Sequence, residues 1–208
     1  MRTVLRTDAP GVDAYRLLTA LVVPRPIAWI STIATDGTGN LAPHSFFNVA
    51  CARPPIVSFA SVGRKDTLGN VDATGEFVVN LAPRDLLDQV NATSAPFPPG
   101  VDEAQALGIA MEPSAHVAPP RVVGSPASVE CTLHSTIELG DSILVLGDVV
   151  AVSIDEAALD GTHPNVEHLA PLSRLGGDEW GWPPEVTSVP RPRRPSDVLP
   201  GSAPDATS

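Results

Sequence analysis

The sequence of 208 residues has little of the residue types that would point to a metal or disulfide-based fold. It has two cysteines, Cys51 and Cys131, and they show neither a disulfide framework nor a zinc-binding spacing. Two buried thiols are the expected state, and a ligand contact by Cys51 is the alternative. The five histidines show no ligand spacing either, so no metal site is expected.

Several nucleotide-binding and nucleophile motifs are also missing. No Gly-x-Gly-x-x-Gly opens a helix, because Gly37-Thr38-Gly39 lies in a predicted turn. There is no Walker loop and no Gly-x-Ser-x-Gly elbow. No catalytic dyad can be recognised, so the catalytic residues stay unknown at this stage.

Long apolar runs and positive charge are both scarce. No window approaches the roughly 20 apolar residues of a membrane helix, and residues 1–8 lack the apolar core of a signal peptide. A cytoplasmic protein with no membrane association is therefore expected. The net charge of −11 gives a surface that repels phosphate backbones, so nucleic-acid binding is not expected. An anionic ligand would need a local positive site.

The C-terminal segment differs in composition from the rest of the chain. Residues 183–208 are rich in proline, poor in large apolar residues and without helical or strand periodicity. They predict a disordered tail after a folded domain of residues 1–182. An inert tail is the favoured interpretation, and a partner-binding role for Pro190–Pro195 is the alternative.

Residues 1–182 contain many strand-like segments and few helical ones. Predicted strands cover 27–35, 41–50, 56–60, 76–81, 129–138 and 143–154, and predicted helices cover 13–21, 66–74, 83–90 and 102–107. The first two strands form a hairpin around the turn 36–40. Residues 143–154 are apolar on both faces, which indicates a central strand or a subunit interface. Because strands and helices do not alternate, a mainly β fold with added helices is predicted, an antiparallel barrel rather than a doubly wound sheet.

The segment Ser61–Thr67 is the positive chemical feature of the sequence. Lys65 is the only lysine in the chain, and it follows Gly63 and Arg64 at the predicted start of a helix. Arginine grips a phosphate with paired N–H groups, lysine adds a point charge, and a helix N-terminus adds free amides. This cluster suits a terminal phosphomonoester. The alternative is a solvated loop in which Asp66 caps the helix.

Further segments follow one another in a specific order around this loop. They are Pro24–Thr32, Asn40–Asn48, Arg53–Pro55, Ser61–Thr67 and Gly75–Leu81. Their order and spacing closely resemble the flavin reductase-like FMN-binding family. The resemblance resumes at Ser128–Asp155 and Pro171–Gly177, so it covers most of residues 20–180.

The resemblance implies a split β-barrel that forms a homodimer, with one FMN per subunit near the interface. By position, it implies contacts from Ser31 and Thr32 to the isoalloxazine ring, from Ser45, Phe46, Phe47 and Asn48 to the ring and ribityl chain, and from Ser61, Arg64, Lys65 and Thr67 to the phosphate. Trp180 stands near the position where the family often has a tyrosine. The hydroxyls on otherwise apolar strands need hydrogen-bond partners, which flavin edges would supply.

The resemblance further implies an FMN-dependent NAD(P)H:flavin oxidoreductase with NAD(P)H as co-substrate. The flavin would carry the hydride chemistry, and no general acid or base is needed, which agrees with the missing dyad. The reduced flavin would pass to a monooxygenase partner, to free flavin or to another acceptor. A non-catalytic FMN-binding protein or electron carrier is the alternative. A flavin-free barrel used for protein contact is the third interpretation.

Overall fold

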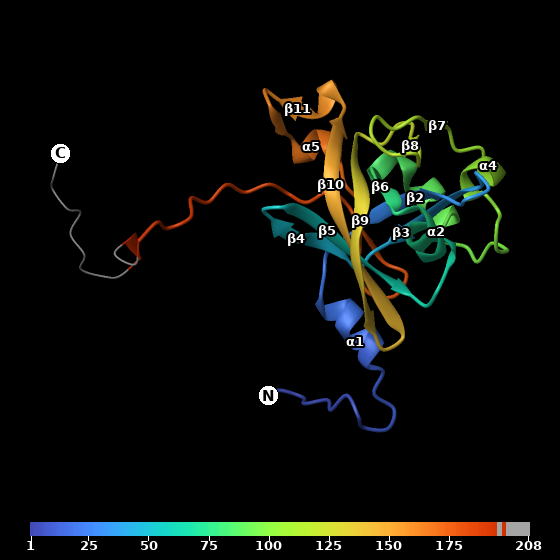
Figure 1. Ribbon diagram of the computed structural model, residues 1–208. Helices are drawn as coiled ribbons and strands as arrows, with labels where there is room; N and C mark the ends of the chain where they lie inside the picture. The colour runs from blue at the N-terminus through green and yellow to red at the C-terminus, as the bar shows by residue number, and fades with distance from the viewer. Residues whose placement is uncertain (195–196, 199–208) are drawn as a thin grey trace, which may run out of the picture.

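A single antiparallel sheet dominates the computed structural model, which describes residues 1–194 and 197–198 (Figure 1). Its seven strands lie in the order β3-β2-β6-β9-β10-β5-β4. The strands are β2 (Ala28–Ile33), β3 (Gly39–His44), β4 (Phe47–Ala52), β5 (Pro55–Val62), β6 (Glu76–Leu81), β9 (Ala127–Leu139) and β10 (Ser142–Ile154). The prediction of a mainly β fold with added helices is confirmed.

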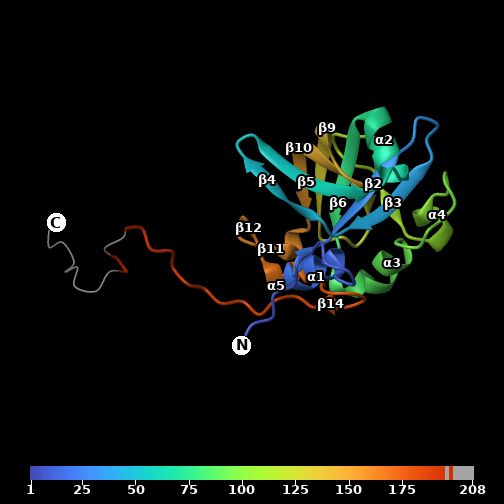
Figure 2. The ribbon, with the colours of Figure 1, turned by 90° about the horizontal axis from the view of Figure 1, so that it is seen from below.

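The two edge strands of this sheet are consecutive in the chain. Only Ser45 and Phe46 separate the end of β3 from the start of β4, although these strands lie at opposite edges. A flat sheet could not be bridged by two residues, so the sheet curls until its edges meet (Figure 2). The Ala60 N–H of β5 donates to the Phe46 carbonyl at 2.9 Å and extends the β4–β5 ladder by one pair, which ties the link to β5. The fold is therefore the split β-barrel that the family resemblance implied.

The predicted second strand, residues 41–50, is wrong in one respect. It is two strands, because β2 pairs with β3 only as far as the Ala28–His44 register. Beyond His44 the chain has no ladder partner on that side. It crosses the opening of the barrel and pairs with β5 instead, with Phe47 opposite Phe59.

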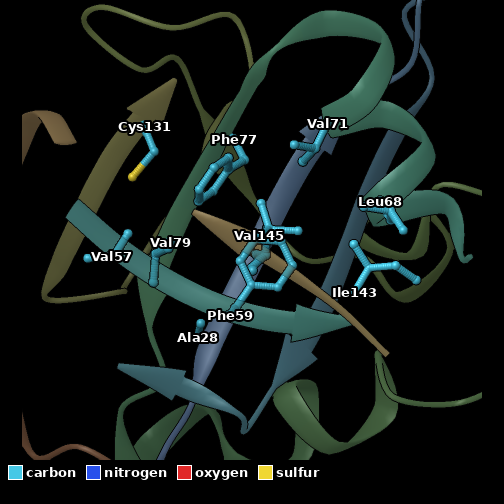
Figure 3. Close-up of a cluster of buried hydrophobic side chains, with 11 residues drawn as sticks. Ala28, Val57, Phe59, Leu68, Val71, Phe77, Val79, Cys131, Ile143 and Val145 are labelled. Atoms are coloured by element: carbon cyan, nitrogen blue, oxygen red, sulfur yellow. The ribbon is translucent and has the colours of Figure 1, made fainter. Parts of the chain in front are cut away.

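The interior of the barrel is filled by apolar side chains from several strands and from α2 (Figure 3). The rings of Phe59 and Phe77 lie 5.4 Å apart at 73°, the edge-to-face arrangement that aromatic pairs prefer. Gly147 of β10 lies against the Phe77 ring so closely that a Cβ there would collide with it. Cys131 is fully buried here, and burial raises the pKa of its thiol to about 12, whereas Cys51 is half-buried.

Short helices and strands cover the barrel. The helices are α1 (Ala14–Leu21), α2 (Asp66–Thr74), a 3₁₀ helix (Arg84–Leu86), α3 (Leu87–Ala92), α4 (Glu103–Leu107), a second 3₁₀ helix (Glu156–Ala158) and α5 (Val166–Leu169). The additional strands are β1 (Arg25–Pro26), β7 (Met111–Glu112), β8 (Arg121–Val122), β11 (Leu159–Asp160), β12 (His163–Pro164), β13 (Ser173–Arg174) and β14 (Trp180–Gly181). The prediction of a helix at 66–74 is confirmed, and Gly75 ends it with φ 73°.

Strand β2 is buried on both faces and joins the barrel to its outer layer. Ala28 and Ile30 belong to the interior cluster, whereas Trp29 belongs to a second cluster under α3 and α4. The Trp29 indole N–H donates to the Thr93 hydroxyl at 2.8 Å. This bond anchors the start of the segment 93–99, which forms one wall of the site described below.

Strand β10 is central in the sheet, one of the two positions that its sequence indicated. It lies between β9 and β5, and yet Val150 and Val152 are 47% and 55% exposed. A subunit interface at this strand stays a prediction. Residues 183–194 form no helix or strand and run away from the barrel (Figure 1). The rest of the predicted tail, 195–208, lies outside the described residues except for 197 and 198, so its disorder stays a prediction. Among the described residues, no helix is long and apolar enough to span a membrane.

Candidate functional site

A cavity of about 550 Å³ lies at the split of the barrel. Its walls are β3, the Ser45–Phe46 link, the end of β5, the start of α2 and the segment 93–99. This volume is within the range of small-molecule sites in proteins. The same two residues that close the sheet therefore also form part of a ligand-sized cavity.

One end of the cavity is positively charged. Arg64 and Lys65 line it from the loop between β5 and α2. Arg64 is exposed and pairs with Asp72 at 2.8 Å and with Glu138 at 3.9 Å, exposed contacts of the kind that contribute little to stability. Within the described part of the chain, Lys65 has no ion pair at all. An anion at this end of the cavity would lie near two cations, although the chain as a whole has a net charge of −11.

The N-terminus of α2 is uncapped by side chains. Lys65 is the N-cap residue, and its side chain makes no capping hydrogen bond. The Asp66 carboxylate, which could have capped the helix, instead accepts from the Gly100 N–H at 3.0 Å. The capping alternative for this loop is therefore wrong. The amides of the first turn remain directed at the cationic end of the cavity, where they favour an anion.

A polar network forms the floor of the cavity. The Thr67 hydroxyl donates to Asn40 Oδ1 at 2.8 Å, and Asn40 Nδ2 donates to both Glu103 oxygens at 3.0 Å. Glu103 also accepts from the Leu41 N–H at 2.9 Å. The buried carboxylate is thus satisfied by neutral donors rather than by a cation. Glu103 therefore forms no ion pair with Arg64 or Lys65.

His44 lines the cavity, and one of its ring nitrogens is buried without a partner. Its Nδ1 lies 3.4 Å from the Ala60 carbonyl, which can only accept, so Nδ1 carries the proton and Nε2 is an acceptor. Among the described residues, Nε2 of His44 and Nε of Arg25 are the buried side-chain polar atoms without a partner. Burial lowers the pKa of His44 to about 4, so the ring is neutral at physiological pH. Nε2 is buried beneath the cavity surface, so a ligand would reach it only if the ring turned.

Aromatic side chains also line the cavity. Tyr15, Phe46 and Phe97 all contribute to its walls, and the Tyr15 and Phe46 rings lie 6.4 Å apart. The whole chain has only nine aromatic residues. Three of them in one cavity favour a ligand with a flat ring system.

The structure brings half of the predicted site residues to the cavity. Those that line it are Ser45, Phe46, Arg64, Lys65 and Thr67. The other predicted residues, all of them described, lie elsewhere: Ser31, Thr32, Phe47, Asn48 and Ser61.

The hydroxyls that were expected to need a ligand are satisfied inside the protein. Ser31 donates to the Pro120 carbonyl, Thr32 accepts from Asn70 Nδ2 at 3.0 Å, and Ser61 donates to the Gly63 carbonyl at 2.8 Å. Phe47 packs on the interior cluster, and the Asn48 side chain accepts from the Val49 N–H at 2.8 Å. The sequence argument that a flavin must supply their partners therefore no longer holds, and flavin contacts by these residues stay predictions.

Several cavity residues were missed by sequence reasoning. His44 lay within a segment already assigned to the site, between Pro43 and Ser45, but was interpreted as an ordinary surface or satisfied histidine. Asn40 lay in the predicted turn. Phe97 lies in the long irregular region 91–126, and Glu103 lies in the short helix predicted within it, and no sequence signal could have placed either residue at the cavity.

Comparison with known proteins agrees with this architecture. Residues 20–170 match the flavin reductase like domain. The chain belongs to this family. A family relative from Deinococcus radiodurans is 40% identical over 183 residues, which is 82% of this chain and 81% of the relative.

Two solved structures of the same fold are named as proteins of redox reactions. Nitrilotriacetate monooxygenase component B from Bacillus cereus has a TM-score of 0.85 and 31% identity, and the match covers 91% of this chain and 98% of that one. The 2-nitrobenzoate 2-nitroreductase of Pseudomonas fluorescens has a TM-score of 0.86 and 28% identity, over 97% and 100% of the two chains. Membership of the flavin reductase like family, together with these relatives, indicates an oxidoreductase.

The residues present fit a flavin mononucleotide. The cations and the uncapped helix end suit its phosphate, and the aromatic side chains suit its ring.

Proposed function

We propose that this protein is an FMN-dependent NAD(P)H:flavin oxidoreductase that binds FMN in the cavity at the split of the barrel. The observation that carries the proposal is the composition of this cavity. Arg64 and Lys65 line it together with the aromatic side chains of Tyr15, Phe46 and Phe97. A phosphorylated molecule with a flat ring is the ligand that matches this combination of chemical groups.

Each part of the cavity has its own task in binding. Arg64, Lys65 and the first amides of α2 hold the phosphate, with the guanidinium turning from Asp72 to the ligand. Phe46 and Phe97 pack on the ring and exclude water from it. Ser45 offers a hydroxyl at the ring end of the cavity.

When bound, the flavin supplies the capacity to accept hydride from NAD(P)H and to pass electrons onward. The task of the protein is to bind and orient. His44 is no proton donor at neutral pH, because the pKa of its ring is about 4. Glu103 is held by three donor contacts, and Asn40 is fixed between Glu103 and Thr67. The polar floor therefore positions the cavity walls and leaves the chemistry to the cofactor.

The proposal includes an acceptor for the electrons of the reduced flavin. One similar structure is named as a component of a monooxygenase and another as a nitroreductase, which supports delivery to a monooxygenase partner or to a small acceptor.

A homodimer is supported by apolar side chains that are exposed on α1, β4, β9 and β10: Leu18, Leu21, Val49, Ile137, Leu139, Val150 and Val152. Light scattering should give twice the chain mass.

The test is an absorption spectrum of the protein mixed with FMN and separated from free flavin, followed by anaerobic titration with NADPH and NADH. Flavin bands that bleach with at least one nucleotide are expected. Bound FMN that neither nucleotide reduces would leave a non-catalytic FMN-binding protein or electron carrier. Absence of bound flavin would reject the cofactor itself.

A further inference from the structure

A second cavity, of about 400 Å³, adjoins the proposed flavin cavity. The two share the wall residues Pro43, Ser45 and Ser94. Asn40, which contacts Thr67 at the phosphate end, lies on the same chain segment as Pro43 and Ser45. At roughly 3.3 Å per extended residue, these two lie about 10–16 Å further along. The second cavity therefore borders the flavin site at the end remote from the phosphate, where the ring would lie.

Arg174 gives this second cavity a positive group that is held in place. Its guanidinium lies over the Trp180 ring at 4.7 Å from the centroid, and its Nη2 donates to the Gly177 carbonyl at 2.7 Å. Both Arg174 and Trp180 line the cavity. A stacked and tethered guanidinium loses little side-chain entropy when it binds a ligand, because its plane is already fixed.

The charge of Arg174 is not neutralised by the protein. Asp178 also lines the cavity, but no ion pair joins it to Arg174 within the described residues. Antiparallel pairing of β1 with β13 places Arg25 directly opposite Arg174, which adds a second positive charge nearby. An anionic ligand would therefore stabilise this part of the molecule.

The other walls indicate a small, flat ligand. Ile27, Pro43 and Trp180 provide apolar surface, and Ser45, Ser94 and Asn91 provide neutral polar groups. The volume is near the lower end of the range for small-molecule sites, which suits a single ring. Arginine presents a planar fork of N–H groups whose geometry matches the two oxygens of a carboxylate.

We propose that the cavity between Arg174, Trp180 and Ser45 binds a small planar carboxylic acid beside the flavin ring, with its carboxylate on Arg174. This inference rests on the proposed function, since it takes the ring end of the first cavity as the neighbour of the ligand. It names the chemical class of a second ligand that FMN binding does not account for.

Benzoate is a suitable probe, measured by isothermal titration calorimetry on the FMN-loaded protein and on the protein without flavin. Benzoate should bind to both, and benzamide, a neutral molecule of similar shape, should bind at least tenfold more weakly. The variant Arg174→Gln should weaken benzoate binding at least tenfold and leave FMN affinity within twofold. Arg174→Lys keeps the charge without the fork and should fall between the two.

Arg84 offers a matched control. Its guanidinium also lies over a tryptophan, Trp182, at 4.9 Å, but neither residue lines the cavity. Arg84→Gln should leave benzoate affinity unchanged. Equal loss in Arg84→Gln and Arg174→Gln, equal affinity of benzoate and benzamide, or a loss of FMN affinity in Arg174→Gln would each overturn the assignment.

Failure of this inference can be told from failure of the proposed function. Arg64→Ala should weaken FMN binding but not the binding of benzoate to the flavin-free protein. If wild-type protein bound benzoate through Arg174 and no FMN, the second cavity would stand and the flavin site would not. If it bound FMN and no benzoate, the flavin site would stand and the carboxylate site in the second cavity would be rejected.

Discussion

The Thr67 hydroxyl donates its hydrogen bond to Oδ1 of Asn40 at 2.8 Å, so it cannot donate to a phosphate at the same time. Thr67 was predicted as a phosphate ligand, and it does line the cavity. Its contribution to an anion would therefore come from its backbone amide in the first turn of α2, whereas its side chain stabilises the floor.

This division of roles predicts the effect of Thr67→Val. The substitution removes the shorter of two hydroxyl contacts to the buried Oδ1 of Asn40 and leaves only Thr32 at 3.4 Å, which should cost about 1–2 kcal/mol of unfolding free energy in urea titrations. FMN affinity, measured by fluorescence quenching, should change less than threefold because the backbone amide remains. Thr67→Ser retains the donor and serves as the control. A tenfold loss of FMN affinity with unchanged stability would show that the hydroxyl itself holds the phosphate.

Asp72 competes with a ligand for Arg64. Their 2.8 Å ion pair is exposed, so Asp72→Asn should change stability little. It should free the guanidinium and remove a negative charge near the phosphate, so FMN should bind more tightly, by roughly two- to tenfold at low salt. Asp160→Asn, in β11 and far from α2 (Figure 1), controls for net charge. Weaker FMN binding in Asp72→Asn would mean that the ion pair positions Arg64 for the ligand.

The low pKa of His44 predicts that the free energy of unfolding falls at acidic pH. Its pKa is about 4 in the folded protein and about 6.5 in the unfolded chain, so the unfolded chain binds the proton more readily. The stabilisation is complete above pH 6.5 and is lost as pH falls from 6.5 to 4, by about 1–3 kcal/mol. His44→Phe keeps a ring against Phe59 and should flatten this part of the profile. Chemical denaturation of both proteins between pH 7 and pH 4 measures it, and parallel profiles would contradict the prediction.

Gly147 and Gly69 form a contrasting pair. A methyl group at Gly147 would collide with the Phe77 ring, so Gly147→Ala should destabilise the barrel by about 1–3 kcal/mol. Gly69 lies within α2 with open space around it, so Gly69→Ala should be neutral or stabilise by up to about 1 kcal/mol. Thermal melts of the two variants provide the comparison. Equal melting temperatures would show that β10 can shift away from Phe77.

Local features of this protein could be predicted from its sequence. The helix α2 has a glycine in left-handed conformation directly after it, and the loop before it gathers arginine, lysine and glycine within three positions. The long strand β9 alternates between apolar and polar residues, and β10 is a long apolar run. Such signals depend only on residues close together in the chain, so they can be recognised without knowledge of the tertiary structure.

Features that depend on distant pairing could not be predicted from the residues alone. The break of the second strand at Ser45 follows from a strand order that brings β3 and β4 to opposite edges. Ser31 and Thr32 are satisfied by Pro120 and Asn70, partners that no local pattern identifies. The segment 93–99 reaches the cavity because Trp29 anchors Thr93. Each of these contacts joins residues far apart in the chain.

The central claim is that the cavity holds FMN with its phosphate on Arg64 and Lys65. Its most direct test is the affinity of wild type, Arg64→Ala and Lys65→Ala for FMN and for riboflavin, which lacks the phosphate. Each substitution should weaken FMN binding by about 1.5–3 kcal/mol, the loss expected for a hydrogen bond to a charged group, and should leave riboflavin affinity nearly unchanged. Ser45→Ala should weaken both ligands alike, because the ring and ribityl chain are common to them. If Arg64→Ala and Lys65→Ala weakened riboflavin as much as FMN, the loop would not be a phosphate site and the claim would be contradicted.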